Sequence, residues 1–183
     1  MLVSFDGSLQ GGGATLQIGV KSLDTAASIP ILAYVRTQWL DSDLDLLGVE
    51  RGDPAGQAKF EAYTLALALN TWQRLLQTAQ GRLAIRGDAL GILHDVLKLK
   101  AREPKLNALA HQMAYILAPV GLDVRLAHVW TERNTICDTL SRCTAAGELD
   151  LPQLSEATRM RMRRFKLLMS VWGDIHNKQQ TQQ

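Results

Sequence analysis

Apolar residues in the first forty positions recur with the period of two that is typical of β-strands. Leu2–Phe5 is a short apolar run, residues 14–20 alternate between apolar and polar, and Pro30–Trp39 forms a third run. We expect these segments to form an antiparallel meander with Gly11–Gly13 as a hairpin connection. The acidic stretch Leu40–Gly56 is predicted to be a solvated loop, because a Gly-Asp-Pro sequence interrupts it.

The apolar period then changes to that of an α-helix. One stripe runs from Ala62 to Leu76, and another runs from Leu106 to Val120 behind a proline. Strands are predicted at Leu83–Arg86 and Leu122–His128, and a short helix is predicted over residues 89–99. Asn134 is placed to cap a last helix. The buried stripe predicted for that helix is Ile136, Leu140 and Cys143.

The order of elements is three strands, a helix, a strand, two helices, a strand and a helix. This order predicts an α/β fold with a five-stranded mixed sheet, three antiparallel strands followed by helix-linked strands, flanked by helices. We assign this domain to residues 1–145. A linker over 146–153, a basic amphipathic helix over 154–173 and a polar, disordered tail over 174–183 are expected to follow.

Composition is that of an ordinary globular protein, with 46% hydrophobic and 21% charged residues in a chain of 183. Charge is uneven, because residues 1–57 carry three basic and seven acidic side chains, whereas residues 151–183 carry six and two. A mixed, solvated surface explains this layout as well as nucleic-acid binding does. The two cysteines form no disulfide framework, and no apolar run is long enough for a membrane span, so an intracellular protein without a membrane partner is expected.

Four acidic residues lie at the ends of predicted elements. Asp6 ends the first strand, Glu61 lies in the first turns of the long helix, Asp88 ends the fourth strand, and Asp138 lies one turn into the last helix. These positions allow the four side chains to meet at one edge of the sheet. Without a cation such a group would repel, and the pKa values of its members would rise. Hard cations such as Mg²⁺ take oxygen ligands, so the pattern predicts a metal site.

One run carries a specific resemblance. His128-Val129-Trp130-Thr131-Glu132-Arg133-Asn134-Thr135-Ile136-Cys137-Asp138-Thr139-Leu140-Ser141-Arg142 resembles the pattern H-V-x-G-x-x-N-x-x-A-D-x-L-S-R, with which the ribonuclease H domains of retroelement reverse transcriptases end. Three further motifs resemble the same family in the right order, and the four together cover residues 1–145. They are Phe5-Asp6-Gly7-Ser8, Phe60-Glu61-Ala62 and Gly87-Asp88-Ala89-Leu90.

The chain departs from the family pattern in three places. Thr or Ser usually precedes the aspartate at the position of Asp88, and small turn residues usually stand where Trp130 and Thr131 stand here. The connection after the fifth strand lacks the longer histidine-bearing loop of cellular ribonucleases H. We therefore assign no catalytic histidine, and we interpret His128 as structural.

The resemblance implies a ribonuclease H-like fold and an endonuclease that cuts the RNA strand of an RNA–DNA hybrid, leaving a 5′-phosphate and a 3′-hydroxyl. It implies two Mg²⁺ ions, for which Mn²⁺ could substitute. In this scheme Asp6 bridges both ions, and Asp138 helps to hold the ion that activates the water. Glu61 and Asp88 help to hold the ion near the leaving 3′-oxygen.

Substrate contacts are expected from the backbone at Gly7 and Ser8 and from the basic residues Lys98, Lys100 and Arg102, although an ordinary solvated helix end explains the basic residues equally well. The partners implied are the hybrid and the polymerase domain of the same reverse transcriptase. The place of action would be the cytoplasm, a retroelement particle or the nucleus. Whether the element is gypsy-like or of the tyrosine-recombinase type stays open.

Two other functions compete with this interpretation. Retroelements contain ribonuclease H-like domains that have lost their metal ligands and serve as connectors or nucleic-acid-binding modules, but here all four acids are present. An exonuclease of the four-acid DEDD class would need a carboxylate two residues after Asp6, and Ser8 stands there.

Overall fold

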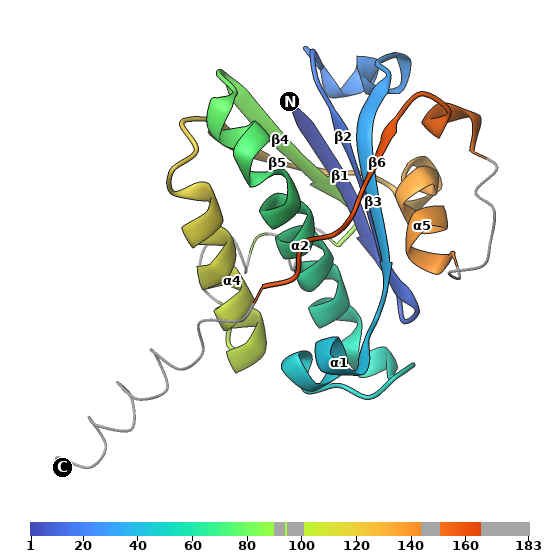
Figure 1. Ribbon diagram of the computed structural model, residues 1–183, viewed down its shortest axis with the longest axis vertical. Coiled ribbons are helices and arrows are strands. Elements are labelled where there is room, and N and C mark those ends of the chain that lie inside the picture. The colour runs from blue at the N-terminus through green and yellow to red at the C-terminus, as the bar shows by residue number, and fades with distance from the viewer. Residues whose placement is uncertain (90–93, 95–100, 144–150, 166–183) are drawn as a thin grey trace, which may run out of the picture.

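The protein is described by a computed structural model in residues 1–89, 94, 101–143 and 151–165 (Figure 1). Its centre is a mixed sheet in which the six strands of the described residues lie in the order β5-β4-β1-β2-β3-β6. The strands are β1 (Leu2–Gly7), β2 (Gly11–Gln17), β3 (Ile31–Gln38), β4 (Arg82–Gly87), β5 (Asp123–His128) and β6 (Thr158–Met160). β1, β2 and β3 are antiparallel, and the other neighbouring pairs are parallel.

Helices cover both faces of the sheet. The α-helices are α1 (Asp41–Leu47), α2 (Gln57–Thr78), α4 (Pro104–Leu117) and α5 (Thr135–Arg142), and the short 3₁₀ helices are η1 (Leu23–Ser28), η2 (Pro54–Gly56), η3 (Thr131–Arg133) and η4 (Pro152–Leu154). In Figure 1, α2 and α4 lie side by side on one face and α5 lies on the other. The predicted α/β fold class is confirmed, and the sheet has one strand more than expected.

The main core lies between the sheet and α2. Most of α2 is buried, because its apolar stripe packs on the sheet while α4 covers its other side. At the end of β3, Trp39 stacks on Phe60 of α2 with ring centroids 5.3 Å apart. The described helices include none that is both long and apolar enough to cross a membrane.

Gly11–Gly13 is part of β2 and not the hairpin connection that the sequence predicts. The turn comes earlier, where the Ser8 amide donates to the Gly11 carbonyl. These glycines are needed because helices pack directly on the strand. A Cβ atom on Gly13 would lie 2.3 Å from Cβ of Leu140 in α5. A Cβ atom on Gly12 would lie 2.4 Å from Oγ1 of Thr64 in α2.

The acidic stretch Leu40–Gly56 is only partly the solvated loop predicted, because it contains α1 and η2. Asp43 of α1 is 2% exposed. Its carboxylate accepts hydrogen bonds from the Leu40 amide, from the Tyr63 hydroxyl at 2.9 Å and from the Arg164 guanidinium at 2.8 Å. These donors hold the pKa of Asp43 below its usual value, although burial acts in the opposite direction. The Asp43 carboxylate is therefore ionised inside the fold. Its ion pair with Arg164 connects α1 to the C-terminal segment.

The prediction of a helix over 154–173 is wrong for residues 154–165, the part that the structure describes. This segment contains η4 and then β6, which pairs with β3 through Ala33, Tyr34 and Val35. The residues from 159 to 163 alternate arginine with methionine, which is the period of a strand. Met162 is buried, while Arg161 and Arg163 are exposed. Of the predicted linker over 146–153, residues 146–150 lie outside the described residues, and so do residues 166–183.

The buried face of α5 also differs from the prediction. Cys137, Leu140 and Ser141 face the sheet, whereas Ile136 and Cys143 are only partly buried. Asn134 occupies the N-cap position, but its side chain does not cap the helix. Its amide instead donates a 2.9 Å hydrogen bond to the Phe5 carbonyl, so it ties α5 to β1. The short helix predicted over 89–99 lies almost entirely outside the described residues.

Candidate active site

Three carboxylates meet where β1 and β4 end. Asp6 lies in β1, Glu61 in the second turn of α2, and Asp88 directly after β4. Each offers an oxygen atom, and these oxygens all lie within 4.8 Å of one another. The grouping follows from topology, because β1 and β4 are parallel neighbours whose carboxyl ends share one edge of the sheet. The structure thus brings together three of the four acids selected from the sequence.

Glu61 is the most enclosed of the three, with 4% of the residue exposed. Its Oε2 accepts from the Gly7 amide at 3.1 Å, and its Oε1 accepts from the Gln57 side chain at 3.0 Å. The pKa of Glu61 is raised to about 9, chiefly by burial and then by the charges of Asp6 and Asp88, while the two hydrogen bonds oppose the rise. Glu61 is therefore protonated near neutral pH when no cation is bound.

Asp6 is buried under α5, where the Ser141 hydroxyl donates to its Oδ2. Burial raises the pKa of Asp6 to about 6, with the Asp88 and Asp138 carboxylates adding to the effect and the Ser141 hydrogen bond opposing it. The two acids with raised pKa values are thus neighbours, and a divalent cation between them would stabilise their ionised forms and lower both pKa values.

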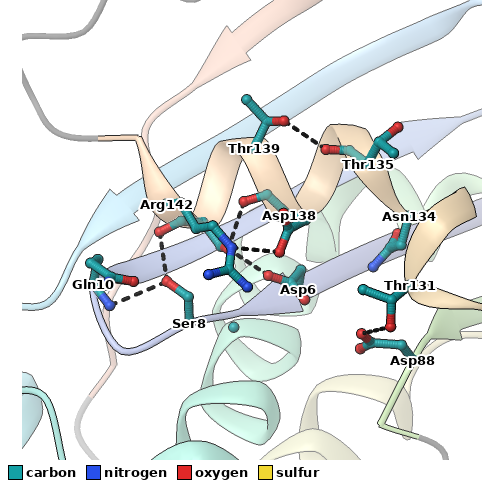
Figure 2. A network of polar contacts seen from close by, with 12 residues as sticks. Asp6, Ser8, Gln10, Asp88, Thr131, Asn134, Thr135, Asp138, Thr139 and Arg142 are labelled. Carbon is teal, nitrogen blue, oxygen red and sulfur yellow. Dashed lines mark hydrogen bonds and ion pairs between the residues drawn. The ribbon is translucent and has the colours of Figure 1, made fainter.

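Asp88 is held from the loop after β5. Its Oδ2 accepts a hydrogen bond from the Thr131 hydroxyl at 3.1 Å, which Figure 2 shows from close by. Its other oxygen, Oδ1, is buried and has no hydrogen-bond partner among the residues that the structure describes. An unsatisfied buried carboxylate oxygen is costly, and a coordinated cation is one of the few groups that satisfies it. Together with the donor set, which consists entirely of carboxylate oxygens, this atom fits a hard divalent cation such as Mg²⁺.

Asp138 lies beside this cluster but is not part of it. Its side chain is 30% exposed, and its Oδ1 accepts from Arg142 Nε at 2.7 Å, one turn further along α5. Figure 2 shows Asp138 and Arg142 together above Asp6. The carboxylate is close enough to influence the pKa of Asp6. In this structure, however, it is engaged by an arginine.

Gly7 and Ser8 are built into the fold at the edge of the site. A Cβ atom on Gly7 would lie 2.6 Å from the Phe60 carbonyl carbon, so glycine is required for α2 to approach β1. Ser8 is 4% exposed, and its hydroxyl donates to the Ser141 carbonyl at 2.9 Å. Arg102 is exposed ahead of α4, while Lys98 and Lys100 lie outside the described residues.

Three supporting residues were not selected from the sequence. Gln57 precedes Glu61 by one helical turn, and its amide also donates to the Gly7 carbonyl. Ser141 belongs to the Leu-Ser-Arg end of the motif, and Thr131 replaces a small turn residue of the family pattern. The i, i+4 spacing of Gln57 and Glu61 is a signal that could have identified the first, but the contacts of the other two depend on the tertiary fold.

Comparison with known proteins supports the fold. No family model matches the chain, and no curated protein matches its sequence. Among solved structures, ribonuclease H1 from the halophilic archaeon Halobacterium salinarum NRC-1 superposes with a TM-score of 0.56 at 17% identity, covering 76% of this chain and 92% of that one. LC11-RNase H1 in complex with an RNA/DNA hybrid gives a TM-score of 0.57 at 16% identity, covering 76% and 91%.

LC11-RNase H1 isolated from compost by a metagenomic approach also matches, with a TM-score of 0.51 at 17% identity. At such low identity these likenesses establish the fold alone. The chain therefore has a ribonuclease H-like fold, structurally similar to ribonuclease H1, and it carries a cluster of three acids at the carboxyl ends of its parallel strands β1 and β4.

Proposed function

We propose that this protein is a ribonuclease H that hydrolyses the RNA strand of RNA–DNA hybrids with two divalent metal ions. The observation that carries the proposal is the cluster of Asp6, Glu61 and Asp88 within 4.8 Å on a ribonuclease H-like fold. The solved structure of LC11-RNase H1 with an RNA/DNA hybrid supports the choice of substrate. Hybrid selection would depend on the shape of the duplex and on the 2′-hydroxyls of the RNA.

Mg²⁺ is the expected ion, and Mn²⁺ is expected to substitute for it. When bound, such ions activate a water molecule and stabilise the leaving oxygen of a phosphodiester. Asp6 lies between Glu61 and the α5 side, so it is the residue that would bridge two ions. Glu61 and Asp88 would complete the ligands on one side, with Gln57 and Thr131 orienting their second oxygens.

Asp138 would complete the ligands on the other side, for which its carboxylate must leave Arg142. The exposed pair can separate at little cost, because surface ion pairs of this kind contribute about 0–1 kcal/mol. Arg142 would then be free to contact a substrate phosphate near the cut. Arg102, Lys98 and Lys100 are proposed to contact the hybrid further away, and Gly7 and Ser8 to line the floor beside the RNA.

A hybrid-cleavage assay in Mg²⁺ or Mn²⁺ tests this function. We expect metal-dependent cutting of the RNA strand to 5′-phosphate and 3′-hydroxyl products and little cutting of double-stranded DNA. Asp6→Asn, Glu61→Gln, Asp88→Asn and Asp138→Asn should each abolish cleavage. Asp123→Asn is the matched control, because Asp123 is an exposed aspartate at the start of β5, and this variant should cleave like the wild type.

The alternative is a catalytically inactive connector or nucleic-acid-binding module. The pairing of Asp138 with Arg142 favours it, because it leaves three acids in the cluster. Tight hybrid binding by the wild type without cleavage in either metal would select this alternative. Retained cleavage in Asp138→Asn, with cleavage lost in the other three variants, would show a three-carboxylate site.

The biological setting that we propose is reverse transcription of a retroelement, with the polymerase domain of the same polyprotein as partner. The four sequence motifs carry this part of the proposal. A tethered polymerase would raise the effective concentration of hybrid at the site, so weak binding by the isolated chain is compatible with efficient cutting. Fusion to a polymerase domain should therefore lower the hybrid concentration that is needed for half-maximal cleavage.

A further inference from the structure

A polar pocket lies on the α5 face of the sheet, outside the carboxylate cluster. Its volume is about 1090 Å³. Its floor consists of side chains that the strand period brings to one face, Ser4, Thr15, Gln17 and Arg86. Its mouth includes Trp130 and Arg133, from the loop that follows β5. The residues assigned to metal binding are not among those that line it.

Arg86 is the feature that the fold leaves unexplained. Its Nε donates to the Ser4 hydroxyl at 3.2 Å. Within the described part of the chain, its two terminal amino groups have no hydrogen-bond partner and no carboxylate pairs with it. The guanidinium is half-buried and lines the pocket, and only its Nε is satisfied by a hydrogen bond to another described side chain. A half-buried arginine that presents two free amino groups to a pocket is arranged to bind an anion.

The other charges of the pocket point the same way. Arg133 also lines it, and Glu156 is the one acidic side chain among its described lining residues. Trp130 adds a flat apolar surface, because it is 67% exposed. The His128 ring packs against it edge to face, with ring centroids 4.9 Å apart. Proteins recognise single-stranded nucleic acid with two elements, a positive charge that binds a phosphate and an exposed aromatic ring that stacks on a base. Arg86 and Trp130 are residues of these two kinds.

The pocket adjoins the candidate active site along the same strands. Ser4 and Asp6 are two residues apart on β1, a separation of about 7 Å between Cα atoms. Arg86 lies in β4 two residues before Asp88, which directly follows that strand. The loop that carries Trp130 also supplies Thr131, whose hydroxyl binds Asp88. A nucleic-acid strand at the carboxylate cluster would therefore reach the pocket within a short distance.

We propose that this pocket binds a single-stranded segment of nucleic acid continuous with the substrate, holding a phosphate on Arg86 and stacking a base on Trp130. The proposal rests on the proposed function in one respect, namely that the bound strand belongs to the hybrid that is cut. Single-strand binding itself needs neither metal nor catalysis, so it can be measured separately.

The test is fluorescence anisotropy of a labelled short oligothymidylate with the full chain in EDTA. Trp130→Ala should weaken binding roughly 5- to 150-fold, the range expected for one lost base stack. Arg86→Met should lower the slope of log affinity against log salt by about 0.7, the contribution of one phosphate contact on a single strand. Arg86→Lys should keep that slope, and Trp130→Ala should not alter it.

Matched controls are available on the same molecule. Arg125→Gln removes an exposed arginine of β5 that does not line the pocket, and Tyr115→Ala removes an aromatic residue of α4 that is 65% exposed. Both should bind like the wild type. If Trp130→Ala binds the oligonucleotide as tightly as Tyr115→Ala does, the proposal is overturned. Both side chains are exposed, so neither substitution is expected to disturb the fold.

Cleavage of hybrid in Mg²⁺ separates the two proposals. If the wild type does not cut but its binding depends on Arg86 and Trp130, the pocket proposal stands and the proposed function fails. If the wild type cuts while the pocket variants bind like their controls, the pocket proposal alone fails.

Discussion

Replacing Glu61 by glutamine should stabilise the protein in the absence of metal, and the gain should grow with pH. The pKa of Glu61 rises from a usual value of 4.5 to about 9 in the folded state, first because of burial and then because of Asp6 and Asp88. Between these values the folded protein keeps a proton that the unfolded chain has released. The stability that Glu61 contributes is therefore fully present below its pKa in the unfolded chain. It is lost as the pH rises towards its pKa in the folded protein.

The magnitude follows from the cost of holding that proton. Each pH unit above the unfolded pKa costs about 1.4 kcal/mol. The cost is about 0.7 kcal/mol at pH 5 and at most about 5 kcal/mol at pH 8. Glutamine does not titrate, and its carbonyl oxygen can still accept from the Gly7 amide. The free energy of unfolding of Glu61→Gln should thus exceed that of the wild type by an amount that increases by about 4 kcal/mol over this range.

Urea unfolding in EDTA at pH 5, 6, 7 and 8 measures the difference directly, since all other titrating groups are common to both proteins. Glu50→Gln, an exposed glutamate between α1 and η2, is the control and should give no such gain. Adding Mg²⁺ at pH 8 should raise the free energy of unfolding of the wild type much more than that of Glu61→Gln, because the bound metal replaces the proton on Glu61. Identical pH dependence of the wild type and Glu61→Gln in EDTA would refute the reasoning.

Two further predictions concern the fold. Arg164→Met should lower the free energy of unfolding at pH 7 by about 3 kcal/mol, because it leaves the buried Asp43 carboxylate without its cation; Arg161→Met, at an exposed position of the same segment, should change it little in the same urea titration. Gly13→Ala should lower the free energy of unfolding by at least about 2 kcal/mol, because its Cβ atom would overlap Leu140. Gly121→Ala is the control, because Gly121 has open space around it and the substitution should leave the melting temperature nearly unchanged. Equal melting temperatures for the two variants would contradict the close packing of α5.

Much of this architecture could be predicted from local periodicity. The strands β1, β3, β4 and β5 and the helices α2 and α4 each carry an apolar pattern long enough to determine their type. The site could be predicted for a related reason, since Asp6 and Asp88 stand where apolar strands end. Parallel neighbours then bring those ends together.

What could not be predicted depends on partners that are far apart in sequence. Asp43 appears solvated until Arg164, 121 residues later, is placed against it. The three-residue pairing of β6 is too short to give a reliable pattern and depends on the position of β3. Asp138 is an equally clear acid in the sequence, but Arg142 one turn away engages its carboxylate, and only coordinates show that choice.

The position of β6 has a practical consequence for anyone who trims the protein to its recognisable motifs. A chain ended at residue 145 would keep all four acids, but it would leave the edge of β3 without its partner strand at Ala33, Tyr34 and Val35. Open strands of this kind recruit other chains and promote aggregation. Such a truncated protein could fail in solution for reasons unrelated to its catalytic residues, and its inactivity would say nothing about the chemistry of the site.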